Sequence, residues 1–292
     1  FSFVPLVYSR LMAVEITKED ELAVDPDRTW QRLSVKLKVE QLSLPLVDLS
    51  QPVKEGFLRV VCLSDTHNKH DQLEVPLGDV LVHAGDFSST GTPDQLQRFA
   101  EFMAAQPHKH KLVIAGNHDV ILDLAKYERT LCKRFHERLC AKEPVDAAAV
   151  KSSFASGEAF TYLEEQLVEI EGVRFYGSPH SPAFHDWAFG PERGPESRAV
   201  WSRVPEKVDV LVTHGPPLGY GDLCRSGNRA GCYSLLCAVH RVRPSFHVFG
   251  HVHEGAGVFS DGTTTFINAS NCDFFYRATN PPIVFDIRKP AL

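Results

Sequence analysis

The sequence of 292 residues lacks any 18-residue apolar run and any excess of basic residues. A membrane-spanning helix needs about 20 consecutive, predominantly apolar residues, so we predict no transmembrane span. The formal net charge of −6 argues against a protein dedicated to a nucleic-acid polymer, because such proteins normally carry a basic excess. What is present, 43% hydrophobic and 23% charged residues, is the composition of an ordinary globular protein.

Paired cysteines are also missing. The chain has seven cysteines, an odd number, and none of them stands in a Cys-x-x-Cys pair. We interpret them as reduced thiols and expect a cytoplasmic protein. The sequence contains no internal repeat and no low-complexity segment, and its length allows one large α/β domain or two small ones.

The first part of the chain differs in character from the rest. Residues 15–55 are acidic and then mixed in charge, with three prolines and no long periodic face. We therefore expect an N-terminal arm over residues 1–56, with one strand at Leu33–Val39, and a single domain over residues 57–292.

Three apolar runs rich in β-formers follow this arm, at Leu58–Leu63, Asp79–His83 and Lys111–Ile114. Each run ends in small residues and then in residue types that ligate metals. A helix is predicted over Asp94–Ala105, between the second and third runs, because its apolar residues recur at helical spacing. The resulting β-α-β unit predicts a parallel sheet.

The second half of the chain continues this alternation of strand and helix patterns. Residues 142–158 have no clear pattern and receive no assignment. The predicted elements are a helix at Val120–Ala141, strands at Thr161–Leu163 and Val173–Gly177, a long loop at Ser178–Gly194, a helix at Pro195–Ser202, a strand at Val208–Thr213, a helix at Tyr233–Arg241, a strand at Phe246–Phe249, and closing antiparallel strands at Thr263–Ile267 and Ile283–Ile287.

Side chains with oxygen or nitrogen atoms that can ligate a metal follow the predicted strands, at the points where the apolar runs end. Open α/β sheets gather their ligands at the carboxyl ends of the strands, so we expect these side chains to meet. Without a thiolate among them, they suit Mn, Fe, Zn or Mg better than copper or an iron–sulfur cluster. The candidate residues are Asp65, His67, Asp86, Asn117, His118, His214, His251 and His253.

Their number suits a two-metal site, in which the ions lie roughly 3.5–4 Å apart. A carboxylate must then lie between the ions, and Asp86 is the natural bridge because it follows the middle strand of the first three. The remaining ligands are assigned as Asp65, His67 and His253 for the first ion and Asn117, His214 and His251 for the second.

The candidate residues lie in five strand-end motifs: Asp65–His67, Gly85–Asp86, Gly116–Asp119, His214–Gly215 and Gly250–His253. Each motif is weak alone, but the five in this order resemble the calcineurin-like metallophosphoesterase superfamily. Five further stretches are similar to its brain-expressed group of metallophosphoesterase-domain-containing proteins: His214–Gly219, Arg243–His253, Asp261–Gly262, Asn268–Ser270 and Asn280–Pro282. The resemblance covers roughly residues 57–287. It implies an α/β fold, a four-layer α/β/β/α sandwich with mixed sheets, and two divalent ions, with Mn favoured over Fe, Zn or Mg.

The resemblance also implies an activity. The expected reaction is hydrolysis of small phosphodiesters, cyclic nucleotides foremost, by a metal-bound hydroxide, with His118 as the acid that protonates the leaving group. Some members of the group carry Gly at the position of His251 and catalyse weakly, so the second metal site is expected to be complete here. The alternative interpretation is a metal-bearing nucleotide-binding or interaction module with little turnover.

A protein phosphatase is disfavoured on sequence grounds. Phe87, Ser88 and Ser89 follow Asp86, where the Ser/Thr phosphatases have Asp-Arg-Gly, and no arginine stands near Asn117 to hold a phosphomonoester. The predicted partner is therefore a small phosphodiester or nucleotide.

Three further residues are candidates for substrate contacts. Asn68 follows the first motif and could touch the phosphate. His180 and Trp187 lie in the long aromatic loop, where Trp187 could stack on a base, since such stacking tolerates any base. A surface position for His180 and simple packing for Trp187 are the alternative interpretations.

Seven other histidines are assigned no role at the site. His83 and His247 lie inside apolar strand patterns and are predicted to be core residues. The others have no strand-end context and are predicted to lie at the surface; they are His70, His108, His110, His136 and His240.

Overall fold

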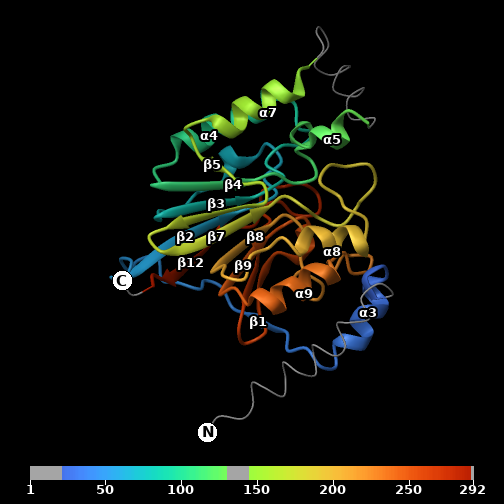
Figure 1. Ribbon diagram of the computed structural model, residues 1–292. Coiled ribbons are helices and arrows are strands. Elements are labelled where there is room, and N and C mark those ends of the chain that lie inside the picture. Colours follow the sequence, from blue (N-terminus) through green and yellow to red (C-terminus); the bar gives the residue numbers. More distant parts are fainter. Residues whose placement is uncertain (1–21, 130–144, 291–292) are drawn as a thin grey trace.

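Two β-sheets lie face to face at the centre of the molecule, and helices cover the outer face of each sheet (Figure 1). The structure is a computed structural model that describes residues 22–129 and 145–290. Its layers run helix, sheet, sheet, helix, and both sheets are mixed. The predicted four-layer α/β/β/α sandwich is therefore confirmed.

The first sheet has five strands and is built mostly from the first apolar runs. Strands buried on both faces read as continuous apolar runs, and all residues from Leu58 to Leu63 are buried. Four strands are parallel, and the last strand of the chain pairs antiparallel with the first of them. Across the sheet the strands are β12 (Ile283–Arg288), β2 (Phe57–Leu63), β3 (Val80–Ala84), β4 (His110–Ile114) and β5 (Thr161–Tyr162).

The second sheet has seven strands, with a parallel centre and antiparallel edges. The central strands β7, β8, β9 and β11 are parallel to one another, while β6, β10 and β1 add antiparallel pairs outside them. Across the sheet the strands are β1 (Glu40–Leu42), β10 (Gly257–Ser260), β11 (Thr265–Asn268), β9 (Phe246–Phe249), β8 (Val210–Thr213), β7 (Val173–Ser178) and β6 (Gln166–Ile170).

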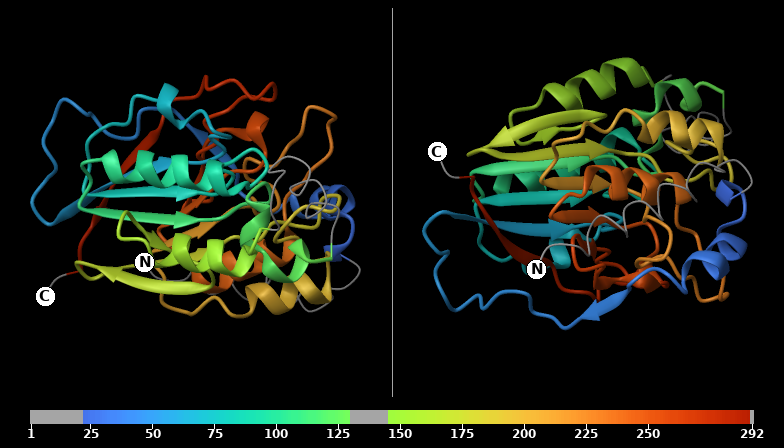
Figure 2. Two further views of the ribbon diagram at one scale, coloured as in Figure 1. Left: turned by 90° about the horizontal axis from the view of Figure 1, so that it is seen from above. Right: turned by 60° about the horizontal axis from the view of Figure 1, so that its bottom comes forward.

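Three apolar cores join the four layers. The core between the sheets contains fully buried valines such as Val60, Val82 and Val248. Figure 2 shows α4 and α7 over the five-stranded sheet and α8 and α9 over the seven-stranded one, each with its own buried core. The helices are α4 (Pro93–Ala105), α5 (Leu124–Tyr127), α7 (Ala147–Ser156), α8 (Pro195–Trp201) and α9 (Tyr233–Val242), with short 3-10 turns η1 (His70–Gln72), η2 (Val120–Leu122) and η3 (His253–Gly255).

The predicted strand at Leu33–Val39 is wrong. Leu33 instead ends a helix, α3 (Pro26–Leu33), and the strand of this region is β1, a few residues later. Asp25 caps α3 by accepting a hydrogen bond from the Arg28 backbone N–H, and a proline follows it in the first turn. These start signals outweigh the β-formers of the region. β1 pairs with β10, so part of the predicted arm contributes to a sheet; the boundary at residue 57 stays a prediction.

The predictions for the middle of the chain hold only in part. The helix at Val120–Ala141 is replaced, over its described part, by η2 and the single turn α5, and residues 130–144 lie outside the described residues. α7 forms within the stretch that received no assignment. β6 and β10 were not predicted, and β11 is antiparallel to β10 but parallel to β9. The other predicted helices and strands form within a few residues of their expected bounds.

The seven histidines without an assigned role differ in burial; His110 and His240 are half-buried, and His136 lies outside the described residues. His83 and His247 are buried core residues, as predicted; Nε2 of each lies within hydrogen-bond distance of a threonine hydroxyl, while Nδ1 of each has no hydrogen-bond partner in the described part of the chain. His70 and His108 are only 2% and 4% exposed, so their predicted surface position is wrong. Contacts with α4 bury His70, whose ring lies 4.7 Å from that of Phe102.

Within residues 22–129 and 145–290, no helix combines the length and the apolarity that crossing a membrane requires.

Candidate metal centre

The loops that follow β2, β3 and β4 meet the loops that follow β8 and β9 at one edge of the sandwich. Backbone hydrogen bonds fasten them together: the Asp65 N–H donates to the Gly85 carbonyl at 2.9 Å, and the Gly250 N–H donates to the His214 carbonyl at 3.0 Å. A β-bridge between Ser64 and Ser270 ties the end of β2 to the segment after β11. The structure thereby brings all seven predicted ligands and His118 into one neighbourhood.

Four of the predicted ligands have left-handed backbone conformations. The φ angles are 51° at Asp65, 42° at His67, 54° at Asp86 and 69° at His251. Residues other than glycine rarely have positive φ, and such strain collects at functional sites, where the surrounding structure imposes it. The turns at the ends of the strands are therefore shaped to aim these side chains inward rather than to relax the backbone.

Two glycines allow the strand ends to approach this closely. A Cβ at Gly116 would lie 2.5 Å from the backbone nitrogen of Asp86, and a Cβ at Gly250 would collide with the Asp65 carboxylate. Glycine at these two positions leaves room for the carboxylates at the centre of the site.

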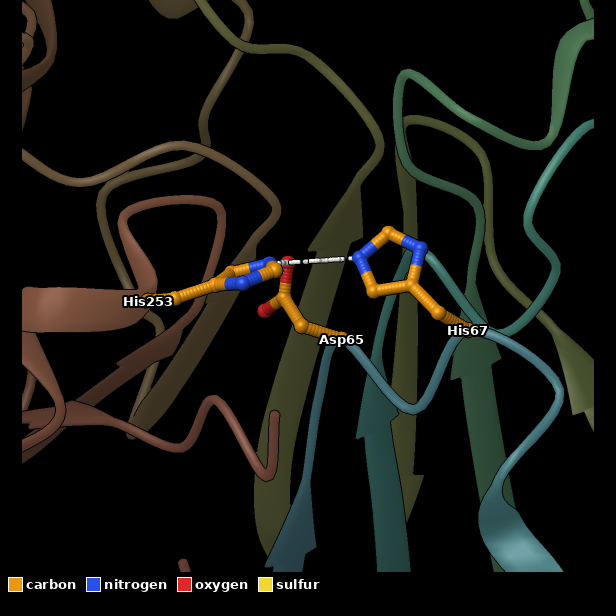
Figure 3. A group of neighbouring side chains, drawn as sticks. All are labelled: Asp65, His67 and His253. Atoms are coloured by element: carbon orange, nitrogen blue, oxygen red, sulfur yellow. Dashed lines mark hydrogen bonds and ion pairs between the residues drawn. The ribbon is translucent and has the colours of Figure 1, made fainter. Parts of the chain in front are cut away.

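The first cluster consists of Asp65, His67 and His253 (Figure 3). Nδ1–H of His67 donates to the Ser88 carbonyl at 3.2 Å, and Nδ1–H of His253 donates to the Asp273 carbonyl at 2.9 Å. In the neutral rings both Nε2 atoms therefore carry lone pairs, and they face each other at 3.2 Å. Nε2 of His253 also lies 3.3 Å from the Asp65 carboxylate. Facing acceptors of this kind are stabilised by a cation between them.

In the second cluster, too, ring nitrogens and side-chain oxygens face one another. Nδ1–H of His214 donates to the Ala84 carbonyl at 3.0 Å, so its Nε2 points at the Asn117 Oδ1 at 2.9 Å and at the Asp86 Oδ2 at 3.4 Å. Nδ1 of His251 lies 2.7 Å from the same Asn117 oxygen. Two imidazoles, an amide oxygen and a carboxylate oxygen thus converge, which is a donor set that suits a borderline divalent cation.

The Asp86 carboxylate lies between the two clusters. Its Oδ2 atom is 3.8 Å from Nε2 of His67, in the first cluster, and 3.4 Å from Nε2 of His214, in the second. Its Oδ1 accepts a hydrogen bond from the His118 backbone N–H at 2.8 Å, which fixes the carboxylate plane. This position is the one that a bridging carboxylate needs.

Burial and charge set the protonation of these groups. Burial alone would raise the pKa of Asp65 and Asp86, but contact with His253 lowers the first and the charge of His214 lowers the second. Burial would likewise lower the pKa of His214, but Asp86 raises it to about 9. Burial lowers the pKa of His67 and His251 to about 3. Ionised carboxylates with neutral imidazoles are the forms that bind metals, and a divalent cation would compete with the proton on His214.

His118 lies at the border of this polar centre. Its Nδ1–H donates to the Ser89 carbonyl at 2.8 Å, which leaves Nε2 directed toward Asp86, 4.0 Å from Oδ2. His67, Asp86 and His118 also form a third group with metal-ligand spacing, so the geometry allows His118 to act near an ion. The Trp187 ring lies against that of His118, with centroids 4.1 Å apart.

The predicted substrate contacts lie at different places. Trp187 borders the centre through His118. Asn68 donates from Nδ2 to the Ser89 hydroxyl at 2.8 Å, and its Oδ1 has no hydrogen-bond partner within the described part of the chain. His180 is held elsewhere, because its Nδ1–H donates to the Phe189 carbonyl and its Nε2 lies 3.4 Å from Glu165.

Sequence reasoning missed Asp119, which joins two of the loops. One carboxylate oxygen accepts hydrogen bonds from the backbone N–H groups of Asp86 and Gly116, at 2.9 and 2.8 Å. The other oxygen accepts from the Ser88 backbone N–H and hydroxyl. Burial and the neighbouring Asp86 raise the pKa of Asp119 to about 7, while these hydrogen bonds oppose the rise. Its position directly after His118 was the available signal.

Sequence reasoning also missed two residues of the chain's last part. The Ser270 hydroxyl donates to the Asp65 carboxylate at 2.9 Å. The Tyr276 ring lies 4.7 Å from that of His67 and 5.2 Å from that of His253. Neither residue follows a strand in a motif that signals metal binding.

Comparison with known proteins identifies relatives of this chain. The human and mouse proteins named metallophosphoesterase domain-containing protein 1 are each 42% identical over 244 residues, covering 82% of this chain and 74% of theirs. A UPF0046 protein of Caenorhabditis elegans is 40% identical over 277 residues, covering 92% of this chain and 91% of its own length. One crystal structure, 14% identical, aligns with a TM-score of 0.50 over 80% of this chain and 99% of that chain, which shows similarity of fold alone.

The match to a family is equally extensive. Residues 58–255 match calcineurin-like phosphoesterases, a metal-dependent family, and this range includes every predicted metal ligand. It spans most of the chain, from the second residue of β2 to the end of η3. The chain therefore belongs to the calcineurin-like phosphoesterase family.

Proposed function

We propose that this chain is a metal-dependent phosphodiesterase that hydrolyses small phosphodiesters, cyclic nucleotides foremost, with two divalent ions. The observation that carries the proposal is the pair of facing lone pairs on His67 and His253, repeated around Asn117 in the second cluster. Asp86 touches both clusters and would bridge the ions. The oxygen and nitrogen donors, without a thiolate, suit Mn, Fe, Zn or Mg, and the proposed metal among them is manganese, as the resemblance to metallophosphoesterases implies.

The residues of the chain would hold and orient the site. Asp65, His67 and His253 would hold one ion, and the side chains around Asn117 the other. Backbone carbonyls accept the Nδ1–H of His67, His253 and His214, which fixes each ring and directs its Nε2 to the ion. When bound, the ions polarise phosphoryl oxygens and lower the pKa of water. His118 would hold on Nε2 the proton that the leaving alcohol needs.

The proposed substrate is a diester rather than a phosphomonoester. Phe87, Ser88 and Ser89 follow Asp86, so the arginine that would hold a second phosphate charge is missing from this loop. The odd number of cysteines, with none in a Cys-x-x-Cys pair, supports a cytoplasmic setting as part of the same proposal.

A substrate screen tests this function. Protein stripped with a chelator is assayed on cyclic nucleotides, aryl phosphodiesters and phosphomonoesters, with Mn, Mg or Zn added back. We expect no activity without metal, recovery with Mn, and faster hydrolysis of diesters than of monoesters. Tight nucleotide binding without turnover under every metal would contradict the enzyme and support a binding module instead.

Replacing His251 by glycine should weaken the second ion without disturbing the fold. Glycine removes the imidazole that approaches Asn117, while the φ of 69° suits glycine better than histidine. We expect a loss of rate of about tenfold or more at limiting metal, with part of the rate restored by added Mn.

The measurement is a titration of rate with Mn for wild type and variant together. The matched control is His185→Gly, since His185 also has positive φ (50°) but lies in none of the clusters. Identical Mn curves for wild type and His251→Gly would mean that His251 does not bind metal.

A further inference from the structure

The loop between β11 and β12 carries an aromatic side chain to the edge of the metal centre. A bridge between Cys272 and Ala278 closes the loop, and Tyr276 lies within it. The Tyr276 ring is 4.7 Å from His67, 5.2 Å from His253 and 6.2 Å from His118, measured between ring centroids. The side chain is 44% exposed, so the ring borders both the polar centre and the solvent.

The loop holds Tyr276 in place through one residue, Asp273. Its carboxylate accepts hydrogen bonds from the backbone N–H groups of Phe275 and Arg277, each at 2.9 Å, and from the Arg277 guanidinium. Its carbonyl accepts from the Tyr276 N–H at 2.8 Å and from Nδ1–H of His253 at 2.9 Å. One carbonyl thus positions a predicted metal ligand and Tyr276 together, while Tyr276 itself is held at a φ of 58°.

The neighbouring aromatic residues of this loop are engaged differently. Arg225 lies over the rings of Phe274 and Phe275, at 4.9 and 5.5 Å, and Arg277 lies over Phe275 at 5.1 Å. These cation–π contacts occupy the two phenylalanines, although Phe275 is 62% exposed. Of the consecutive residues Phe274, Phe275 and Tyr276, the last has its ring against the histidines of the metal centre.

A second segment supplies aromatic side chains on the other sides of the centre. Trp187, from the loop between β7 and α8, lies against His118 at 4.1 Å. Phe184, from the same loop, is 53% exposed and has its ring 6.3 Å from that of His251. A polar centre that would take the phosphate is therefore bordered by flat, partly exposed rings from two separate loops.

We infer that Tyr276 is a specificity-determining residue whose ring stacks on the planar base of a nucleotide whose phosphate occupies the metal centre. The inference rests on the proposed function for the position of the phosphate. A ring beside a phosphate site recognises a flat substituent through stacking, which tolerates any base and strengthens binding by about tenfold or more. The ligand class is thus a phosphate ester that carries an aromatic ring, in preference to a sugar or alkyl phosphate.

Equilibrium binding tests the inference independently of turnover. Adenosine monophosphate and ribose 5-phosphate are titrated by calorimetry into the Mn-loaded full chain. The variants are Tyr276→Ala, Tyr276→Asn, which tolerates the positive φ, and Tyr276→Phe, which keeps the ring. Phe275→Ala is the matched control from the same loop.

Wild type, Tyr276→Phe and Phe275→Ala should bind the adenine nucleotide about tenfold or more tightly than ribose 5-phosphate. Tyr276→Ala and Tyr276→Asn should lose most of this preference, with unchanged affinity for ribose 5-phosphate. In hydrolysis of 3′,5′-cyclic AMP, the same two variants should raise KM and leave kcat nearly unchanged.

Equal affinities of the nucleotide for wild type and both ring-removing variants would overturn the inference. So would a wild type that binds the two phosphates equally, or binds neither. A wild type that shows the base preference but hydrolyses no diester would contradict the proposed function and leave the role of Tyr276 standing. Turnover without any base preference would support the proposed function and overturn the role of Tyr276.

Discussion

Replacement of Asp86 by asparagine should abolish phosphodiester hydrolysis and lower the occupancy of both metal positions. The variant keeps the shape of the side chain but loses its charge, and one carboxylate oxygen becomes an NH₂ donor. In the wild type Oδ2 lies within 4 Å of ring nitrogens from both clusters, at 3.8 Å from His67 and 3.4 Å from His214. Because a bound ion contributes several kcal/mol to such reactions, we expect a loss of about 10³-fold or more.

Metal content per chain and rate, measured on the same preparation, check this expectation. Asp94→Asn is a suitable control, since Asp94 is an exposed carboxylate on α4 that pairs with Arg98. The control should retain the wild-type metal content and rate. Two ions per chain in Asp86→Asn would show that Asp86 is not the bridge.

The buried strands could be predicted from the sequence because their side chains are apolar on both faces. β2 and β9 are examples, with runs that match their observed bounds closely. β6 was missed because three of its five residues are exposed and it forms an edge of the sheet. α3 was missed because its signal lies in the cap at Asp25 and in two buried residues, rather than in a long apolar face.

The candidate site was predictable as far as it depends on strand ends. Parallel strands bring their carboxyl ends to one edge, so residues such as Asp65 and Asn117 could be expected to meet from the order of strands alone. Ser270 could not be found this way, because a serine hydroxyl that donates to Asp65 belongs to none of the metal-ligand motifs. Tyr276 depends in the same way on a loop conformation that Asp273 sets through its own hydrogen bonds.

The left-handed residues mark the limit of sequence reasoning at this site. Nothing in the composition of the motifs requires a positive φ at Asp65 or Asp86, yet both adopt it. Asp119 explains part of this geometry, since its carboxylate accepts the backbone N–H groups of Asp86 and Ser88 and so holds the turn after β3. Such support arises from tertiary contact between loops, which local propensity does not encode.

Replacement of His118 by alanine should leave the metal content unchanged and slow hydrolysis by about 10²–10⁴-fold on substrates with poor leaving groups. The ring is oriented by its hydrogen bond to the Ser89 carbonyl, and Nε2 is the atom that remains for proton transfer. An alkoxide needs this proton as it departs, whereas p-nitrophenolate is stable without it. The loss should therefore be large for cyclic nucleotides and small for aryl diesters.

Rates on 3′,5′-cyclic AMP and on bis(p-nitrophenyl) phosphate, with metal content measured in parallel, provide the test. His118→Asn is the matched variant, because an amide could still donate to the Ser89 carbonyl but has no proton to transfer at neutral pH. Both variants should give the same dependence on the leaving group. Equal losses on the two substrates would argue that His118 binds the phosphate or supports a metal ion, since its Nε2 lies only 4.0 Å from Asp86. An acid role requires a larger loss of rate on 3′,5′-cyclic AMP than on bis(p-nitrophenyl) phosphate, whose leaving group needs no proton.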